Sequence, residues 1–297
     1  MKLIVRADDV GYTNVCNIGA FETIYNGVTT AADLMLDTPG AVDAMERLKE
    51  LPWISVGWHG HFWGSPVLDP SAVPTMYNPQ TGHFRTDLNR AEDVSYDECI
   101  AEMRAQMDRC AKIMGRVPDT GMAHGESPFS RAMMDICKEY GIVTDFAWQK
   151  PFFSPDPDKS FRAPAQFADR KIYMGIGGGY AMKYINNNDI KEHVKYDPLP
   201  DLFDGSLLGE VPEDGTGVFV LHPGYVDHYV THEGDQGPNA PNYLIVRPVD
   251  VYALCSQEIK NWIKENKIEL CSFTDALYGN RKYQNHLRAV GSDLYMG

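Results

Sequence analysis

The 297-residue sequence predicts one α/β domain over residues 1–297, a distorted (β/α) barrel with seven or eight mostly parallel strands. Strand-like and helix-like segments alternate along the chain, which is typical of a parallel sheet. Ionisable residues follow several strand-like segments, and the carboxyl ends of all strands share one face of a barrel. No linker or low-complexity block divides the chain. An open, doubly wound sheet is the alternative.

The first elements show clear local signals. They are, in order, a strand at 3–5, a helix capped by Asn14 and ending at Gly27, a strand at 28–36, a helix at 41–51 and a strand-like run at 54–57. A proline-rich excursion at about 63–92 then interrupts the pattern and is expected to be an irregular loop. Ser95-Tyr96-Asp97-Glu98 matches a capping box and predicts a helix that ends at Gly115.

The remaining segments continue the alternation. Ser127-Pro128 predicts the start of a helix that ends near Gly141, residues 250–266 another helix, and Thr274 the cap of a short last one. The expected strands lie at 118–123, 142–147, 171–175, 217–221 and 268–273, with a second excursion at about 150–170 and a polar loop at 224–243.

Composition narrows the partners. A formal charge of -14 disfavours nucleic acid and anionic membranes, which attract basic surfaces, and leaves a small neutral molecule compatible. Neither a signal peptide nor an apolar run long enough to span a bilayer is evident, so a cytoplasmic protein is expected. The six cysteines lack a paired spacing and are expected to be reduced core residues.

Five ionisable residues follow strand-like runs. Asp8 and Asp9 follow the first strand, and Gly11 after them allows a sharp turn. Adjacent buried carboxylates need a cation or a shared proton to compensate them. His59, His124 and His222 follow later strands, so a barrel would bring all five residues to one face.

One carboxylate and two imidazoles can hold a divalent ion and leave positions open for water and substrate. We therefore predict Asp9, His59 and His124 as metal ligands. The ion would lower the pKa of its water to about 7, Asp8 would take the proton, and His222 would protonate the leaving group. Successive strand residues face opposite sides, so a turn must begin by Asp8 or Asp9 if both are to reach one site.

Several motifs resemble those of the YdjC-like carbohydrate deacetylases, which include chitooligosaccharide deacetylases. They are Ala7-Asp8-Asp9-x-Gly11, Asn17-x-Gly19, Gly27-Val28-x-Thr30, Gly57-Trp58-His59, a histidine six positions after Pro118, and His222-Pro223. The resemblance implies a distorted barrel that holds magnesium or zinc and removes an acetyl group from N-acetylated sugars, in a homodimer. It assigns the same ligands, with Asp8 as base and His222 as acid.

The sequence departs from this pattern in two places. The family often has asparagine where this chain has His61, which could be an outer-shell group, an extra ligand or a loop histidine. The surroundings of His124, Met122-Ala123-His124-Gly125-Glu126, replace a histidine-rich run, which leaves the choice of sugar open. Candidate substrate-binding residues are Tyr12, His61, Trp63, Tyr225 and Arg247, although Arg247 could instead orient Asp8 or form a surface ion pair.

Other functions remain compatible with these residues. Two histidines and a carboxylate also describe the iron site of oxygenases, for which oxygen consumption with ferrous iron is the discriminating assay. A glycosidase would use the paired carboxylates and cleave glycosidic bonds. A sugar-binding protein without catalysis would keep its ligand affinity after substitution of Asp8 or His222.

Overall fold

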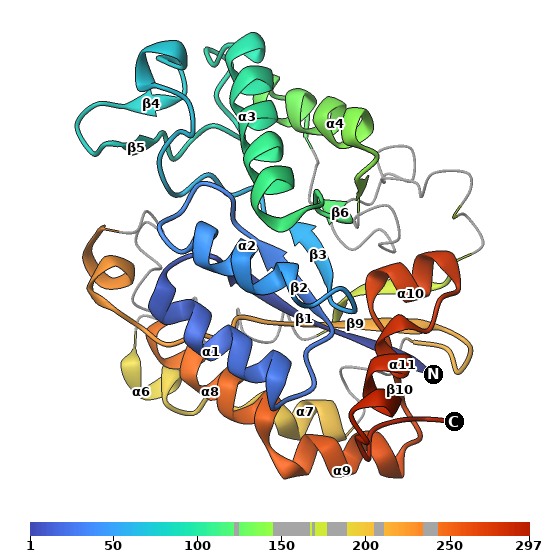
Figure 1. Ribbon diagram of the computed structural model, residues 1–297. Helices are drawn as coiled ribbons and strands as arrows, with labels where there is room; N and C mark the ends of the chain where they lie inside the picture. Colours follow the sequence, from blue (N-terminus) through green and yellow to red (C-terminus); the bar gives the residue numbers. More distant parts are fainter. Residues whose placement is uncertain (122–124, 145–166, 168–169, 177–188, 205–210, 234–242) are drawn as a thin grey trace.

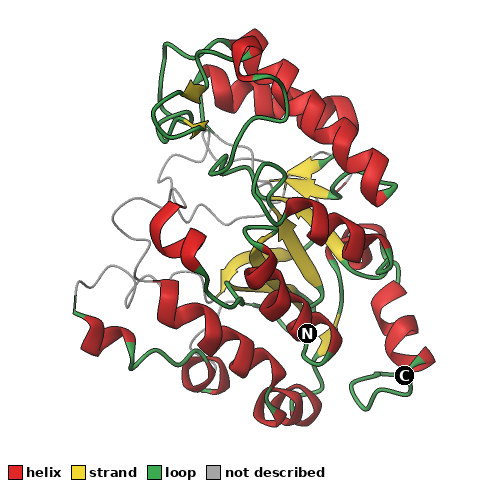
Figure 2. Ribbon diagram, turned by 60° about the vertical axis from the view of Figure 1, so that its left-hand side comes forward, coloured by secondary structure: helices red, strands yellow, loops and turns green. Residues whose placement is uncertain are grey.

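The computed structural model describes residues 1–297 except 122–124, 145–166, 168–169, 177–188, 205–210 and 234–242 (Figure 1). Its main sheet has eight strands in the order β7-β6-β3-β2-β1-β9-β8, with β10 paired to β1, and each described pairing is parallel. The strands are β1 (Lys2–Val10), β2 (Ala31–Leu34), β3 (Ser55–Trp58), β6 (Thr120–Gly121), β7 (Val143–Thr144), β8 (Ile172–Ile176), β9 (Thr216–Leu221) and β10 (Glu269–Leu270). The sheet curls into an arc, which confirms the predicted distorted barrel (Figures 1 and 2).

Helices cover the outer side of the arc in nearly the order of the strands. Neighbouring contacts run from α4 to α3, α2, α1 and α8, so each helix packs beside the next (Figures 1 and 2). The helices are α1 (Asn14–Tyr25), α2 (Ala41–Lys49), α3 (Tyr96–Met114), α4 (Pro128–Tyr140), α6 (Ile190–His193), α7 (Leu199–Phe203), α8 (Tyr243–Cys255), α9 (Gln257–Glu265), α10 (Phe273–Tyr278) and α11 (Lys282–Ala289). None of the described helices is long and apolar enough to cross a membrane.

Strand β1 is the centre of the sheet. It pairs with β9 from Lys2 to Ala7, while β10 and then β2 share its other edge. Leu3, Ile4 and Val5 are fully buried because layers cover both faces of the sheet. The strand is longer than the predicted 3–5, since Asp8 and Asp9 continue it to Val10.

The ends of helices were predicted well where the sequence has a clear capping residue. The Ser95 hydroxyl accepts a hydrogen bond from the Glu98 N–H at the start of α3, and Gly115 ends the helix with φ 80°. The predicted helix at 250–266 is wrong, because α8 already begins at Tyr243 and a second helix, α9, starts after Ser256.

Two further caps differ from the predicted residues. Thr13 rather than Asn14 caps α1, through a hydrogen bond from the Cys16 N–H. Ser272 rather than Thr274 caps α10, because Ser272 and Asp275 form a reciprocal capping box. Both corrections move the cap by only one or two positions and leave the helices in place.

The first excursion is partly ordered. It contains the short helix η1 (Pro70–Ala72) and the hairpin of β4 (Tyr77–Asn78) and β5 (His83–Phe84). The buried Glu102 of α3 holds its start by accepting the N–H groups of Val67 and Leu68. The polar loop after β9 contains a π-helix, η4 (Tyr229–Glu233). The second predicted excursion, at about 150–170, lies almost entirely outside the described residues.

Candidate metal and catalytic site

The end of β1 turns two neighbouring carboxylates toward one region. Arg6 and Asp8 share a face of the strand, and Arg6 Nε lies 2.7 Å from Asp8 Oδ1. Asp9 has φ 59°, in the left-handed region, and the β1–β2 register shifts between Ala7 and Val10. This irregularity breaks the alternation of the strand, so Asp8 and Asp9 both reach the same end of the sheet.

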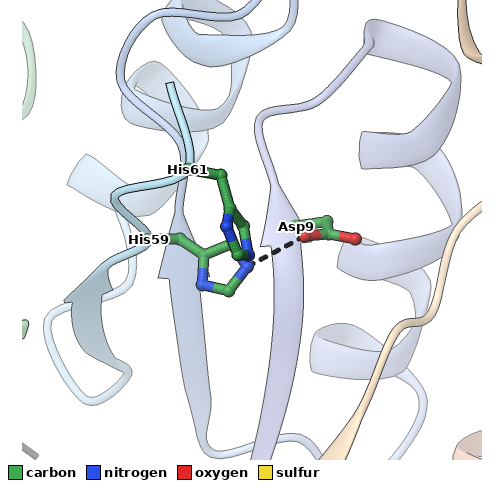
Figure 3. Close-up of side chains that lie close together, drawn as sticks. All are labelled: Asp9, His59 and His61. Atoms are coloured by element: carbon green, nitrogen blue, oxygen red, sulfur yellow. Dashed lines mark ion pairs between the residues drawn. The ribbon is translucent and has the colours of Figure 1, made fainter. Parts of the chain in front are cut away.

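Asp9 lies between a histidine and an arginine. Its Oδ1 is 2.9 Å from His59 Nε2 (Figure 3), and its Oδ2 accepts a hydrogen bond of 2.6 Å from Arg247 Nη2. Burial raises the pKa of Asp9, but Arg247 and His59 outweigh this effect and hold it well below its usual value. Asp9 is therefore an ionised, fixed carboxylate. Arg247 is fully buried, so its interpretation as a surface ion pair was wrong.

His59 is oriented by a second carboxylate that the sequence analysis missed. Its Nδ1 lies 3.3 Å from Asp33 Oδ2, the same oxygen that Arg6 Nη1 approaches to 3.3 Å. This contact favours a proton on Nδ1, while Nε2 points toward Asp9. Burial lowers the pKa of His59, but Asp33 and Asp9 outweigh it and raise the pKa to about 10, so the site favours positive charge.

Gly57 makes room for Asp33. A Cβ atom added to Gly57 would lie 1.8 Å from Asp33 Oδ1, so any larger residue would displace this carboxylate. Asp33 lies within the predicted strand at 28–36 and Arg6 directly follows the one predicted at 3–5, and neither was proposed as a site residue. The available signal was a charged side chain inside an otherwise apolar run, as in Ala31-Ala32-Asp33-Leu34.

Asp8 and His222 face each other on the other side of the site. Asp8 Oδ2 lies 4.0 Å from His222 Nε2. Burial raises the pKa of Asp8 against the opposing effect of Arg6, and burial lowers the pKa of His222. Asp250 accepts the His222 backbone N–H at 2.8 Å and the Tyr196 hydroxyl at 2.7 Å, which anchors the residue after β9.

The aromatic residues proposed to bind substrate differ in their burial and in their neighbours. Tyr12 is fully buried, and its ring meets Trp63 edge-on with centroids 5.8 Å apart. Trp63 is half-buried. The Tyr225 hydroxyl donates a 2.9 Å hydrogen bond to Glu22 of α1. His124, a predicted ligand, lies outside the described residues.

His61 lies beside His59 and keeps solvent access (Figure 3). Its ring meets the His59 ring at 89° with centroids 4.1 Å apart. One ligand atom from each of Asp9, His59 and His61 lies within 4.8 Å of the other two. Asp8, Asp33 and His59 form a second, overlapping group of this kind.

The donor atoms fit a divalent ion. Asp9 Oδ1 and His59 Nε2 are buried, and apart from their 2.9 Å contact with each other neither has a hydrogen-bonded partner among the described residues. Such atoms are uncommon in folded proteins, and a cation would satisfy both. The 2.9 Å between these two atoms would let one small cation contact both.

A cavity of about 280 Å³ adjoins His61, just below the size of typical small-molecule pockets. It is lined by Gly60, His61, Asn89, Gly125, Phe129, Ser130 and Met133. Another cavity of about 290 Å³ lies near Lys2 and Thr216, at the amino ends of β1 and β9. Of these two cavities, the first adjoins the ionisable cluster, through His61.

The chain is similar to known proteins over most of its length. Residues 2–265 match the family model described as YdjC-like protein. A carbohydrate deacetylase of Brevibacillus brevis is 24% identical, covering 93% of this chain and 99% of the relative. A chitooligosaccharide deacetylase of Proteus mirabilis is also 24% identical, covering 93% and 98%.

A solved structure shares the fold. It belongs to a protein of Enterococcus faecalis V583 that carries the provisional name cellobiose-phosphate cleavage protein. The two folds superpose with a TM-score of 0.63 at 21% identity, over 93% of this chain and 98% of the other. The similarity therefore extends over most of both chains.

Proposed function

The chain belongs to the YdjC-like protein family, and on this premise we propose that it is a metal-dependent hydrolase that removes the acetyl group from an N-acetylated sugar or short oligosaccharide. The main support is the ionised Asp9 beside His59 Nε2, at the carboxyl ends of parallel strands. The names of the relatives, carbohydrate deacetylase and chitooligosaccharide deacetylase, support the class of substrate.

We propose Asp9, His59 and His124 as the residues that hold the ion, and two imidazoles favour zinc over magnesium. When bound, the ion polarises the acetyl carbonyl and lowers the pKa of a nearby water. Arg247 occupies Asp9 Oδ2 and so leaves Oδ1 for the ion. Asp33 keeps the His59 ring in the orientation that presents Nε2.

Asp8 and His222 would move the protons. Asp8 takes a proton from the attacking water, and its raised pKa suits a group that must hold that proton. His222 donates a proton to the amide nitrogen as the C–N bond breaks. The 4.0 Å between Asp8 Oδ2 and His222 Nε2 supports roles for both groups at one reacting carbon.

The cavity beside His61 has room for about one sugar ring. Phe129 offers an apolar surface to a pyranose face, and Asn89 and Ser130 offer hydrogen-bonding groups. His61 lines this cavity and stacks on Trp63. A homodimer and a cytoplasmic location remain predictions from the sequence.

The test is acetate release from a panel of N-acetylated mono- and disaccharides, with and without a chelator. We expect chelator-sensitive acetate release with intact glycosidic bonds and no oxygen consumption. Asp9→Ala should abolish metal binding, and His222→Ala should retain the metal but lower kcat by about 10²–10⁴-fold. Glycosidic cleavage without acetate, or normal turnover in either variant, would contradict the proposal.

A further inference from the structure

The turn after β3 places a second imidazole beside His59. The His61 N–H donates to the His59 carbonyl at 3.0 Å, and Phe62 adopts φ 57°. Gly60, between the two histidines, packs so tightly that an added Cβ would lie 1.7 Å from Met133 Cε. In a regular strand, the Cα atoms of residues two apart lie about 6–7 Å apart. The ring centroids of His59 and His61 are only 4.1 Å apart.

Aromatic packing holds the His61 ring in place. The ring stacks on Trp63 with centroids 4.2 Å apart and an angle of 6° between the planes. Trp63 in turn meets Tyr12, which is fully buried. Stacking covers a face of the imidazole and leaves its edge nitrogens available. One of them belongs to the group of ligand atoms that lie within 4.8 Å of one another (Figure 3).

The charges around the site favour a cation with a neutral extra ligand. Asp8, Asp9 and Asp33 face Arg6 and Arg247, which leaves the carboxylates one charge in excess. A neutral imidazole adds a donor atom without adding negative charge. With Asp9, His59 and His124, His61 would give the ion one carboxylate and three imidazoles.

From this geometry we infer that His61 is a ligand of the same ion as Asp9 and His59. The inference rests on the proposed function only in requiring an ion at this place. His61 also lines the cavity of about 280 Å³, so the ion is held at the edge of that cavity. Substrate would then reach the ion past Gly60 and His61.

The test measures binding of Co²⁺ and Zn²⁺ alone by calorimetry, together with the visible spectrum of the Co²⁺ protein. His61→Asn should raise the Kd for both ions about 100-fold or more and change the Co²⁺ spectrum, because a ligand is lost. His83→Asn is the matched control, since His83 lies on the hairpin and contacts Ser65. It should leave the Kd and the spectrum unchanged.

Unchanged Kd and spectrum in His61→Asn would overturn the inference. If the wild-type protein still binds the ion and releases acetate in that case, the proposed function survives. Absence of ion binding in the wild-type protein would overturn both. Trp63→Leu adds a second check, because it removes the stacking partner and keeps the imidazole. It should raise the Kd less than His61→Asn does.

Discussion

Arginine and aspartate form close ion pairs in two regions of this molecule, and the surroundings make the two pairs different. At the end of β1, Arg247 and Asp9 lie 2.6 Å apart, with 0% and 3% of their side chains exposed. In the hairpin region, Arg85 and Asp93 lie 3.0 Å apart, with 25% and 73% exposed. The two pairs therefore have similar interatomic distances but different surroundings. Arg247 and Asp9 are desolvated and set the charge of a site, whereas Arg85 and Asp93 are hydrated and lie on the surface.

The difference lies in what remains when one partner is removed. Water can solvate Asp93 if Arg85 is lost, so the pair contributes little to stability. Asp9 has no such access, and an unpaired buried carboxylate is strongly unfavourable. The loss of stability on substitution should consequently differ between the two regions by far more than the interatomic distances suggest.

The largest effect is expected from Arg247→Met. It should lower the free energy of unfolding by about 3–5 kcal/mol in urea denaturation with a chelator present, because Asp9 stays buried without its arginine. Adding Zn²⁺ should restore part of the loss, since the ion supplies positive charge. The double variant with Asp9→Asn should also recover stability. Equal stability of Arg247→Met and wild type would contradict the claim that burial makes this pair more important than the exposed one.

A smaller effect is expected from Asp33→Asn. The side chain keeps its shape but loses the charge that faces Arg6 and His59 Nδ1, so the His59 ring is held less firmly. The affinity for Zn²⁺ measured by calorimetry should fall about 10–100-fold. Asp135→Asn, at an exposed carboxylate that accepts the Tyr96 hydroxyl, is the control. The same loss in both variants would contradict an orienting role for Asp33.

Asp37 provides a third case for this comparison, because its carboxylate is buried but has no close arginine partner like that of Asp9 among the described residues. Burial raises its pKa to about 6, and the Gly64 N–H and Arg109 oppose this only in part. The folded state therefore holds the proton more tightly than the unfolded state. The stabilisation is fully present below about pH 4 and is lost as the pH rises through about 6.

Asp37→Asn should remove this pH dependence. Between pH 4 and pH 7 the wild-type protein should lose up to about 3 kcal/mol more stability than the variant, according to chemical denaturation across the range. Asparagine can still accept the Gly64 N–H, so the loop stays attached. Parallel stability curves for the two proteins would show that Asp37 does not carry the effect.

The smallest effect is expected from Arg85→Ala. Arg85 contacts Asp87, Asp93 and the Thr75 carbonyl in the hairpin region. Because these groups are largely hydrated, Tm should fall by at most about 2 °C in calorimetry. Zn²⁺ affinity should not change. A loss as large as that of Arg247→Met would mean that exposure does not separate the two regions.

Local signals allowed most of the fold to be predicted. Ser95 and Gly115 mark the ends of α3 within the sequence itself, so that helix was found almost to the residue. The boundary between α8 and α9 was missed, since both sides of Ser256 continue an apolar helical pattern. The length of β1 was also missed, because charged residues at 8 and 9 look like the end of a strand.

The site could be predicted only where it follows the pattern of strand ends. Asp8, Asp9, His59 and His222 come together as expected, because parallel strands end on one side. Arg247 meets Asp9 across 238 positions of sequence, and no local pattern specifies that contact. Helix packing decides it, which is why its role was left open.

The central place of β1 has a consequence for how the protein is made. β1 is synthesised before the other described strands, and Arg247, which neutralises Asp9, follows 238 residues later. At ordinary rates of translation this interval is roughly 10–50 s. Until β9 arrives, one edge of β1 is unpaired and open to other nascent chains. The buried charge of Asp9 therefore stays without its arginine until all strands of the described sheet except β10 have been synthesised.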